Sequence, residues 1–265
     1  MNFPFIKKPS AKDDFLSAVA QDRMTYVVQP ISCALDNTLE LYGECLVRMV
    51  NREGRLVAPD AFIPQLEAAG NISLLDEHMI TLALSHLNQT ERGALGCNIS
   101  VDTIQDNNAW NSVYKIIAEN SHLADRLIIE ITETRPIAHI DAFIENLAQA
   151  RSLGCRIAVD DFGDGYMSPA MLLRLEVDIV KIDKSLLRNI RSSGQNHSSL
   201  HHIIGFAKAV APLVVVEGVE DARDLIRSAA AGATHVQGYF ICKPRPKGFL
   251  PEHSPIDPIR QSLLF

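Results

Sequence analysis

The sequence predicts an α/β fold, a TIM-like (β/α)8 barrel with one antiparallel strand near the N-terminus. The chain has 265 residues, which suits one such barrel of about 250 residues. Apolar, β-branched runs alternate with helix-like stretches, a pattern that favours a parallel sheet with crossovers. Acids and amides recur directly after these runs, and a ring of parallel strands brings such strand ends together.

The strands and helices can be predicted in order along the chain. Strand-like runs cover residues 26–30, 39–47, 95–99, 126–131, 156–159, 179–182, 214–216 and 235–239. Amphipathic stretches at 11–20, 76–88 and 140–153 predict helices. Only a short turn region around Asp36 and Asn37 separates the first two strands. This is the spacing of a hairpin, so one early strand should run antiparallel.

The same pass predicts an N-terminal arm at 1–22, a barrel at 23–250 and a C-terminal tail at 251–265. The first 15 residues contain lysines but no apolar stretch typical of a secretion signal. No run approaches the roughly 20 apolar residues of a membrane helix. We therefore expect no membrane insertion.

The charge and the cysteine content narrow the class of protein and its expected location. The 32 acidic and 25 basic residues give a net charge of −7, which argues against DNA as a partner. The five cysteines are odd in number, widely spaced and free of any Cys-x-x-Cys pair. Neither a disulfide framework nor a zinc ribbon is indicated, and a cytoplasmic location fits best.

Five short polar signatures each follow an apolar run. They are Glu-Cys-Leu-Val-Arg at 44–48, Asn-Ile-Ser at 98–100, Glu-Ile-Thr-Glu at 130–133, Asp-Asp-Phe-Gly at 160–163 and Glu-Gly-Val-Glu at 217–220. We interpret them as one active site. Hard oxygen ligands gathered in one place suit Mg²⁺ or Mn²⁺.

These residue types predict a two-metal site. Three carboxylates and one amide oxygen could hold the first ion: Glu44, Asn98, Glu130 and Asp160. Asp161 can serve a second ion, and two ions roughly 4 Å apart can activate a water for in-line displacement at phosphorus. Lys181 interrupts an apolar strand, where an unpaired charge is unfavourable. We expect it to stabilise the nucleophile or the developing negative charge.

Structural roles remain open for several of these residues. A carboxylate after a strand often caps the next helix, which applies to Asp161 and to Glu220 with Asp221. Asn98 alone can be a buried amide or a turn former. Ser168 and Pro169 are typical of an N-cap and a first helical residue. A histidine cluster matches no zinc pattern and is interpreted as a polar helix surface: His197, His201 and His202.

Together these motifs resemble the EAL-domain family, bacterial phosphodiesterases that open cyclic di-GMP. The resemblance spans about residues 24–246, in matching order and spacing. It includes further matches at Gln-Pro-Ile 29–31, Lys-Ile-Asp 181–183 and Gln-Gly-Tyr 237–239. It implies a two-metal barrel that uses Mg²⁺ or Mn²⁺ to hydrolyse cyclic di-GMP to linear pGpG.

The resemblance also implies roles for individual residues. The implied metal ligands are Glu44, Asn98, Glu130, Asp160 as the bridge, and Asp161 on the second ion. Lys181 and Glu217 are the implied catalytic pair that orients or deprotonates the attacking water. The implied substrate contacts are Gln29, Arg48, Asp183 and Gln237. Glu133 and Glu220 are the implied supports for the Asp161 loop and neighbouring ligands.

The sequence departs from the family pattern at three places. Cys45 stands where the family usually has alanine, and a small, modest hydrophobe should leave Glu44 in position. Asp164 and Met167 stand where small residues are usual. An additional acid beside a metal pair can alter ion affinity or repel phosphates.

Two other functions remain open. One is a non-catalytic relative that binds cyclic di-GMP or a protein partner through the same barrel. The other is an unrelated barrel enzyme that stabilises an enolate with Mg²⁺, which explains the acids but not Arg48 or Gln29. No GGDEF cyclase domain, a frequent partner in this family, is found in this sequence. Regulation is therefore expected from a protein acting in trans, from expression or from ligand levels, and a homodimer is also open.

Overall fold

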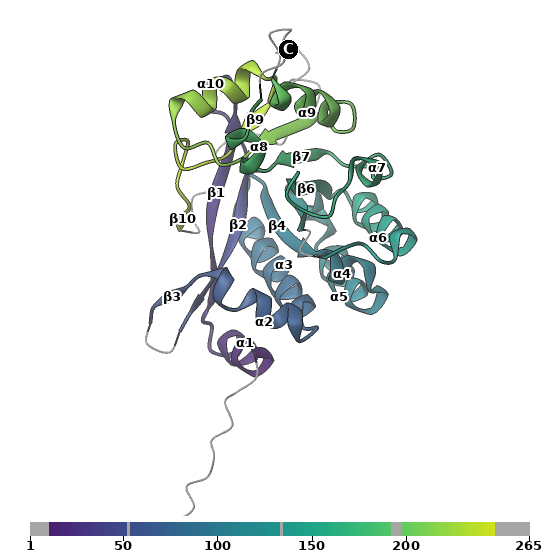
Figure 1. Ribbon diagram of the computed structural model, residues 1–265. Coiled ribbons are helices and arrows are strands. Elements are labelled where there is room, and N and C mark those ends of the chain that lie inside the picture. Colours follow the sequence, from purple (N-terminus) through teal and green to yellow (C-terminus); the bar gives the residue numbers. More distant parts are fainter. Residues whose placement is uncertain (1–10, 52–53, 133–134, 192–197, 247–265) are drawn as a thin grey trace, which may run out of the picture.

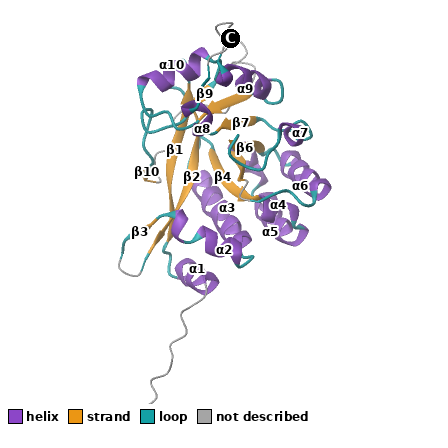
Figure 2. Cartoon of the chain, in the orientation of Figure 1, coloured by secondary structure: helices purple, strands orange, loops and turns teal. Residues whose placement is uncertain are grey.

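A computed structural model of the chain describes residues 11–51, 54–132, 135–191 and 198–246. The strands are β1 Met24–Cys33, β2 Glu40–Val50, β3 Leu56–Val57, β4 Leu95–Ser100, β5 Leu127–Thr132, β6 Arg156–Phe162, β7 Ile179–Ile182, β8 Leu213–Val216, β9 His235–Val236 and β10 Arg245–Pro246. The α-helices, drawn in purple in Figure 2, are α1 Ala11–Ala20, α2 Ile63–Ala68, α3 Ile72–Asn88, α4 Val101–Gln105, α5 Asn107–Glu119, α6 Ile140–Ser152, α7 Pro169–Leu172, α8 Lys184–Arg188, α9 Ser199–Lys208 and α10 Ala222–Ala230. Short 3₁₀ helices cover Pro59–Ala61 and Ser121–Arg126.

Strand β1 closes the sheet into a barrel. It pairs antiparallel with β2 along most of its length and antiparallel with β9 at its end. The pairings from β2 through β4, β5, β6, β7 and β8 to β9 are all parallel. Within the described residues the barrel therefore has eight strands, and the predicted fold class is confirmed.

The hairpin between β1 and β2 forms where the sequence predicted it. The Asp36 carboxylate accepts hydrogen bonds from the Thr38 amide (3.1 Å) and the Thr38 hydroxyl (2.6 Å). The Leu39 amide closes the turn by donating to the Asp36 carbonyl at 3.0 Å. These local bonds reverse the chain, because an Asx side chain can replace a backbone acceptor in a tight turn.

Side chains along each strand point alternately into the barrel and out towards the helices, which gives two separate apolar layers. One cluster fills the barrel interior and includes Ile31, Tyr42, Ile128, Ile179 and Val215. A larger cluster lies between the barrel and its helices, and Figure 1 shows α3, α4, α5 and α6 on the outside of the strands. Inward positions near the carboxyl ends of the strands lie above the interior cluster. These positions carry the polar residues described below.

Strand β9 is shorter than predicted. Residues 235–239 were expected to be strand, but the ladder includes only His235–Val236. Gly238 then lies against the backbone of Val219, where an added Cβ would stand 2.1 Å from the Val219 carbonyl oxygen. The Val219 amide donates to the Gln237 carbonyl at 3.0 Å. This close approach takes residues 237–239 out of the ladder and over the loop that follows β8.

Other elements match the sequence predictions. Helix α1 forms, and its Phe15 ring packs edge-on against His78 at a centroid distance of 6.2 Å. Ser168 caps α7 by accepting a hydrogen bond from the Met171 amide at 3.1 Å. The boundaries at 22 and 250 stay predictions. Glu133, His197 and the tail at 251–265 lie outside the described residues. None of the described helices is long and apolar enough to cross a bilayer.

Candidate active site

A fully buried lysine lies at the centre of the site. Lys181, on β7, has no solvent exposure, and four carboxylates surround its Nζ atom. The distances from Nζ are 3.1 Å to Glu44, 2.7 Å to Glu130, 2.6 Å to Asp160 and 2.9 Å to Glu217. An ammonium group has only three N–H donors. At least one carboxylate is therefore held by charge without a hydrogen bond.

Parallel pairing brings these residues together from distant parts of the chain. The carboxylates come from different strands: Glu44 from the middle of β2, where β2 pairs with β4, Glu130 and Asp160 from the carboxyl-end halves of β5 and β6, and Glu217 from directly after β8. Asn98 on β4 is the register partner of Glu130. The predicted convergence of strand ends is thus present, since parallel strands all end at the same rim of a barrel.

The carboxylates form two groups that share one residue. Oxygen atoms of Glu44, Glu130 and Asp160 lie within 4.8 Å of one another, and so do those of Asp160, Asp161 and Glu217. Two buried oxygens have no hydrogen-bond partner among the described residues, Asn98 Oδ1 and Glu130 Oε1, whereas Glu130 Oε2 and Asp160 Oδ1 have the Lys181 ammonium as their partner. Unpaired oxygens of this kind fit divalent ions that prefer oxygen ligands. Asp160 is the residue that belongs to both groups.

The carboxylates respond differently to burial. Burial raises the pKa of Glu130 to about 8 and that of Asp160 to about 6, with the neighbouring carboxylates adding to the shift. Burial also raises the pKa of Glu217 well above its usual range. At a pH below its pKa, each of these carboxyl groups binds a proton. Protons therefore neutralise part of the cluster when no cation does so.

Glu44 and Lys181 behave in the opposite way. Burial alone would raise the pKa of Glu44, but the Lys181 charge and hydrogen bonds lower it overall. Gln237 donates to Glu44 at 2.7 Å, and Asn98 donates to it at 3.0 Å. Burial would lower the pKa of Lys181, but the surrounding carboxylates raise it well above its usual value. These opposite shifts favour the charged forms of both Glu44 and Lys181.

The end of β6 and the loop that follows it have a constrained backbone, and the pairing of β6 with β7 shifts register between Val159 and Phe162. Asp161 adopts a left-handed conformation with φ of 49°, which is uncommon for a residue other than glycine. Its carboxyl group shares a hydrogen bond with Glu217. The Asp164 amide donates to the Asp161 carbonyl at 3.1 Å. Asp161 therefore faces the site and is not the cap of a described helix.

The two departures in this loop have different environments. Met167 is buried and belongs to the apolar layer between barrel and helices. Asp164 is exposed to solvent. Met167 is thus a packing residue in this chain.

The residues implied as substrate contacts mostly bond to nearby backbone. Gln29 donates to the Cys242 carbonyl at 3.2 Å, and Arg48 donates to the Val47 carbonyl at 2.7 Å. Asp183 caps α8 by accepting from the Ser185 amide at 2.7 Å. These bonds place Gln29 and Asp183 in the wall of a pocket beside the carboxylates.

Glu220 and Asp221 lie at the start of α10. Asp221 caps the helix by accepting from the Arg223 amide at 2.8 Å, which is the structural role considered for it. The Glu220 carboxylate pairs with Arg188 at 2.9 Å. Arg188 also binds Asp224 at 2.8 Å. The described contacts of Glu220 are thus with α8 and α10, and none is with the Asp161 loop.

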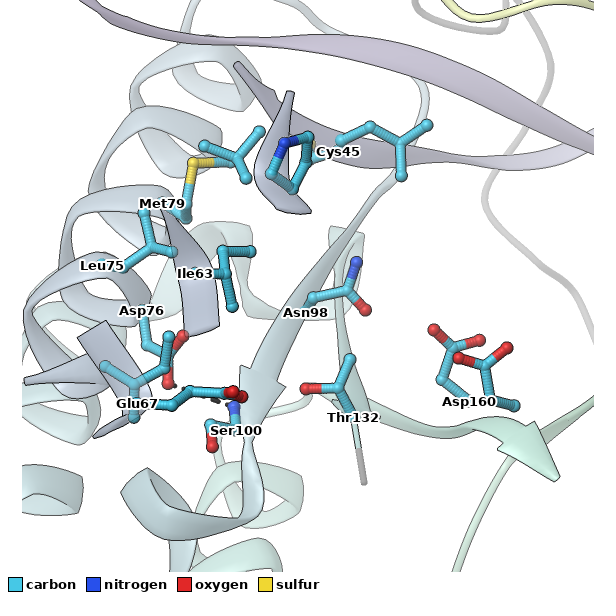
Figure 3. Close-up of a pocket in the computed structure, with 15 residues that line it drawn as sticks. Cys45, Ile63, Glu67, Leu75, Asp76, Met79, Asn98, Ser100, Thr132 and Asp160 are labelled. Carbon is cyan, nitrogen blue, oxygen red and sulfur yellow. Dashed lines mark hydrogen bonds between the residues drawn. The ribbon is translucent and has the colours of Figure 1, made fainter. Parts of the chain in front are cut away.

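Two pockets open beside the carboxylates. A cavity of about 300 Å³ is lined by Asn98, Asp160 and apolar side chains from α2 and α3. Figure 3 shows Asp76, Glu67 and Ser100 at one end of this pocket and Asp160 at the other. A more polar cavity of about 390 Å³ is lined by residues that include Gln29, Glu217 and Tyr239. The carboxylates therefore lie between an apolar pocket and a polar one.

Asp76 was not anticipated from the sequence. Its carboxyl group is 4% exposed and accepts hydrogen bonds from the Ser100 amide and the Thr103 hydroxyl. Burial raises its pKa to about 7. Its position within an amphipathic helix gave no signal, because a buried acid there becomes visible only when β4 and α4 pack against it.

Comparison with known proteins matches these observations. The family model of the EAL domain matches residues 12–244. The chain is 32% identical over 229 residues to cyclic di-GMP phosphodiesterase PdeF of Escherichia coli K12, covering 84% of this chain and 30% of that protein. It is 30% identical over 246 residues to cyclic di-GMP phosphodiesterase NbdA of Pseudomonas aeruginosa, covering 91% and 31%. The chain thus spans about a third of the length of these relatives.

Solved structures share the fold. The FimX EAL domain from Pseudomonas aeruginosa bound to c-di-GMP matches with a TM-score of 0.78 at 22% identity, covering 89% of this chain and 97% of that one. The EAL domain protein from Listeria monocytogenes matches with a TM-score of 0.75 at 24% identity, covering 91% and 95%. At these identities the likeness establishes the barrel architecture.

Proposed function

This chain belongs to the EAL domain family, and we propose that it is a metal-dependent phosphodiesterase that hydrolyses cyclic di-GMP to linear pGpG. The observation that carries the proposal is the pair of acidic groups that share Asp160 around Lys181. A cyclic dinucleotide has two anionic phosphodiesters and two flat bases. An acidic centre loaded with cations, between an apolar pocket and a polar one, suits both parts of such a ligand.

The residues divide into ion-holding and chemical roles. Glu44, Asn98, Glu130 and Asp160 would hold one ion, and Asp160 with Asp161 would hold a second. Bound Mg²⁺ or Mn²⁺ would supply Lewis acidity and lower the pKa of a water molecule. Hydrogen bonds from Asn98 and Gln237 orient the Glu44 carboxylate for this task.

Lys181 and Glu217 are suited to the chemical step. The oxygen of the attacking water forms a bond to phosphorus and its proton passes to Glu217. The bond from phosphorus to the 3′ oxygen breaks, and that oxygen leaves with the electron pair and takes up a proton from solvent to give the 3′ hydroxyl. The Lys181 ammonium, 2.9 Å from Glu217, orients that carboxylate and stabilises negative charge that develops on the phosphoryl oxygens. The product is a linear dinucleotide with a 5′ phosphate.

Incubation of the purified protein with cyclic di-GMP tests the proposal. Chromatography should detect pGpG when Mg²⁺ or Mn²⁺ is present and none after thorough chelation. Separate titrations with the two ions decide which one supports turnover at lower concentration. Undiminished turnover after chelation would contradict the metal mechanism. Binding of the nucleotide without any pGpG would instead favour the receptor function.

The remaining expectations about partners are not needed for this chemistry. A cytoplasmic location, a homodimer and a regulatory protein acting in trans stay predictions. Sedimentation of the purified protein with and without cyclic di-GMP would test the homodimer.

A further inference from the structure

Tyr42 is a buried polar residue that the proposed mechanism does not use. It lies on β2, two residues before Glu44, and has no solvent exposure. Its ring belongs to the small apolar cluster inside the barrel. Its hydroxyl group has no hydrogen-bond partner among the described residues. Burying a hydroxyl without a hydrogen bond costs free energy, so the presence of this one needs an explanation.

The Tyr42 ring lies beside an equally unpaired acceptor. An added Cβ on Gly96 would stand 1.9 Å from Glu130 Oε1 and 2.5 Å from Tyr42 Cε2. The edge of the phenol ring and the carboxylate oxygen therefore lie close to the same point. Glu130 Oε1 is buried and has no hydrogen-bond partner in the described part of the chain. The ring of Tyr42, whose hydroxyl is unpaired, thus lies beside a buried acceptor that is unpaired as well.

Gly96 makes this arrangement possible. Any larger residue at this position of β4 would put its side chain into the space that the Tyr42 ring and the Glu130 carboxylate share. Burial raises the pKa of Tyr42 well above its usual value, and the Glu130 charge is the next largest cause. The hydroxyl is therefore a proton donor at all ordinary pH values, and it lies within the field of the carboxylate cluster.

We propose that Tyr42 is a positioning residue of the metal centre, whose hydroxyl donates a hydrogen bond to Glu130 Oε1 when an ion binds. That bond would fix the orientation of the carboxylate, whose Oε2 lies 2.7 Å from the Lys181 ammonium. Hydrogen bonds to the second oxygen of a ligating carboxylate commonly orient it and raise metal affinity. The inference rests on the metal centre of the proposed function.

Tyr42→Phe tests the inference because it removes one hydroxyl and leaves the ring in place. Mn²⁺ is titrated into the nucleotide-free protein, and free ion is measured by electron paramagnetic resonance. We expect the variant to bind Mn²⁺ about tenfold more weakly than the unchanged chain. The melting temperature of the metal-free variant should not fall, because the removed hydroxyl has no partner to lose.

Tyr26→Phe is the matched control. Tyr26 is also buried, but its hydroxyl bonds to His86 Nδ1 at 2.6 Å on the outer side of the barrel wall. This substitution should lower the melting temperature and leave Mn²⁺ affinity unchanged. The control separates loss of a tyrosine hydroxyl in general from loss of the one beside Glu130.

A double-mutant cycle identifies Glu130 as the residue through which Tyr42 acts. In a Glu130→Gln background, Tyr42→Phe should change Mn²⁺ affinity by less than twofold. A tenfold loss in that background, or affinity within twofold of the unchanged chain for Tyr42→Phe alone, would overturn the inference. Failure of the unchanged chain to bind Mn²⁺ would refute the metal centre and the inference together. Normal metal-dependent hydrolysis with unaltered binding by Tyr42→Phe would refute the inference alone.

Discussion

Lys181 and Glu130 form an ion pair of 2.7 Å in which neither side chain is exposed to solvent. Removing one partner of such a pair leaves an uncompensated buried charge, which is strongly unfavourable. Three further carboxylates compete for the same ammonium group. The carboxylates therefore balance the buried charge of Lys181, and they leave an excess of negative charge that bound cations would stabilise.

Lys181→Ala should lower turnover by about 10²- to 10³-fold, because it removes a preorganised positive charge near the reacting phosphate. Nucleotide affinity should change far less. Steady-state kinetics and a separate binding titration in chelator measure the two effects. Equal losses in both would mean that the lysine is chiefly a binding group.

Asp160→Ala should abolish turnover and remove both ions, since Asp160 belongs to both acidic groups. Asp161→Ala should remove only one. Metal counting by equilibrium dialysis measures this difference. Cys45→Ala is the control and should leave turnover and stoichiometry nearly unchanged, because its side chain lies in the apolar layer outside the barrel. Two ions retained by Asp160→Ala would contradict the shared ligand.

Metal affinity should rise with pH up to about pH 8. Burial and negative neighbours raise the pKa of Glu130 to about 8, so below that value an ion must displace a proton from this ligand. Calorimetric titration of Mn²⁺ in buffers of different ionisation enthalpy measures the released protons. Glu130→Gln should release fewer protons and show a flatter pH dependence. Equal proton release by the unchanged chain and by Glu130→Gln would contradict the role of Glu130 as the ligand that loses a proton.

His235 should destabilise the fold on acidification. Burial lowers its pKa from 6.5 to about 4, so the unfolded chain takes up a proton that the folded chain resists. The contribution of neutral His235 to the free energy of unfolding is fully present above pH 6.5 and is lost as the pH falls from 6.5 towards 4. The loss amounts to about 3 kcal/mol at pH 4.

Urea unfolding of His235→Gln at pH 7 and at pH 4.5 checks this pH dependence. The glutamine side chain at position 235 cannot take up a proton. The free energy of unfolding of the variant should therefore fall less between these pH values than that of the unchanged chain. The other titrating groups are common to both proteins and cancel in the comparison. Parallel losses in the two proteins would show that His235 is not the source.

Much of the site could be predicted because each ligand candidate directly follows an apolar run. Glu44, Asp160 and Lys181 stand out as charges within or beside strand patterns, and a parallel barrel has only one rim where such ends meet. Asp183 also had a local signal, since Asp before Lys184 and Ser185 is typical of an N-cap. Its cap on α8 follows from that local chemistry.

Other residues had no local signal. Tyr42 is an aromatic residue within a strand, and Asp76 is an acid within a helix, so both fit ordinary patterns. Their roles depend on neighbours far along the chain: Tyr42 on Gly96 and Glu130, and Asp76 on Ser100. The early end of β9 likewise depends on the contact of Gly238 with Val219.

The sequence alone determined the alternation of strands and helices, the hairpin at Asp36, and which acids and amides stand at strand ends. Periodicity and turn chemistry are local properties, so they can be read from neighbouring residues. Only the tertiary structure decided that β1 closes the barrel, that Asp160 is shared by two acidic groups, and that Lys181 lies buried among four carboxylates. Distances and burial arise from contacts between residues remote in sequence, and these contacts shift the pKa values on which the chemistry depends.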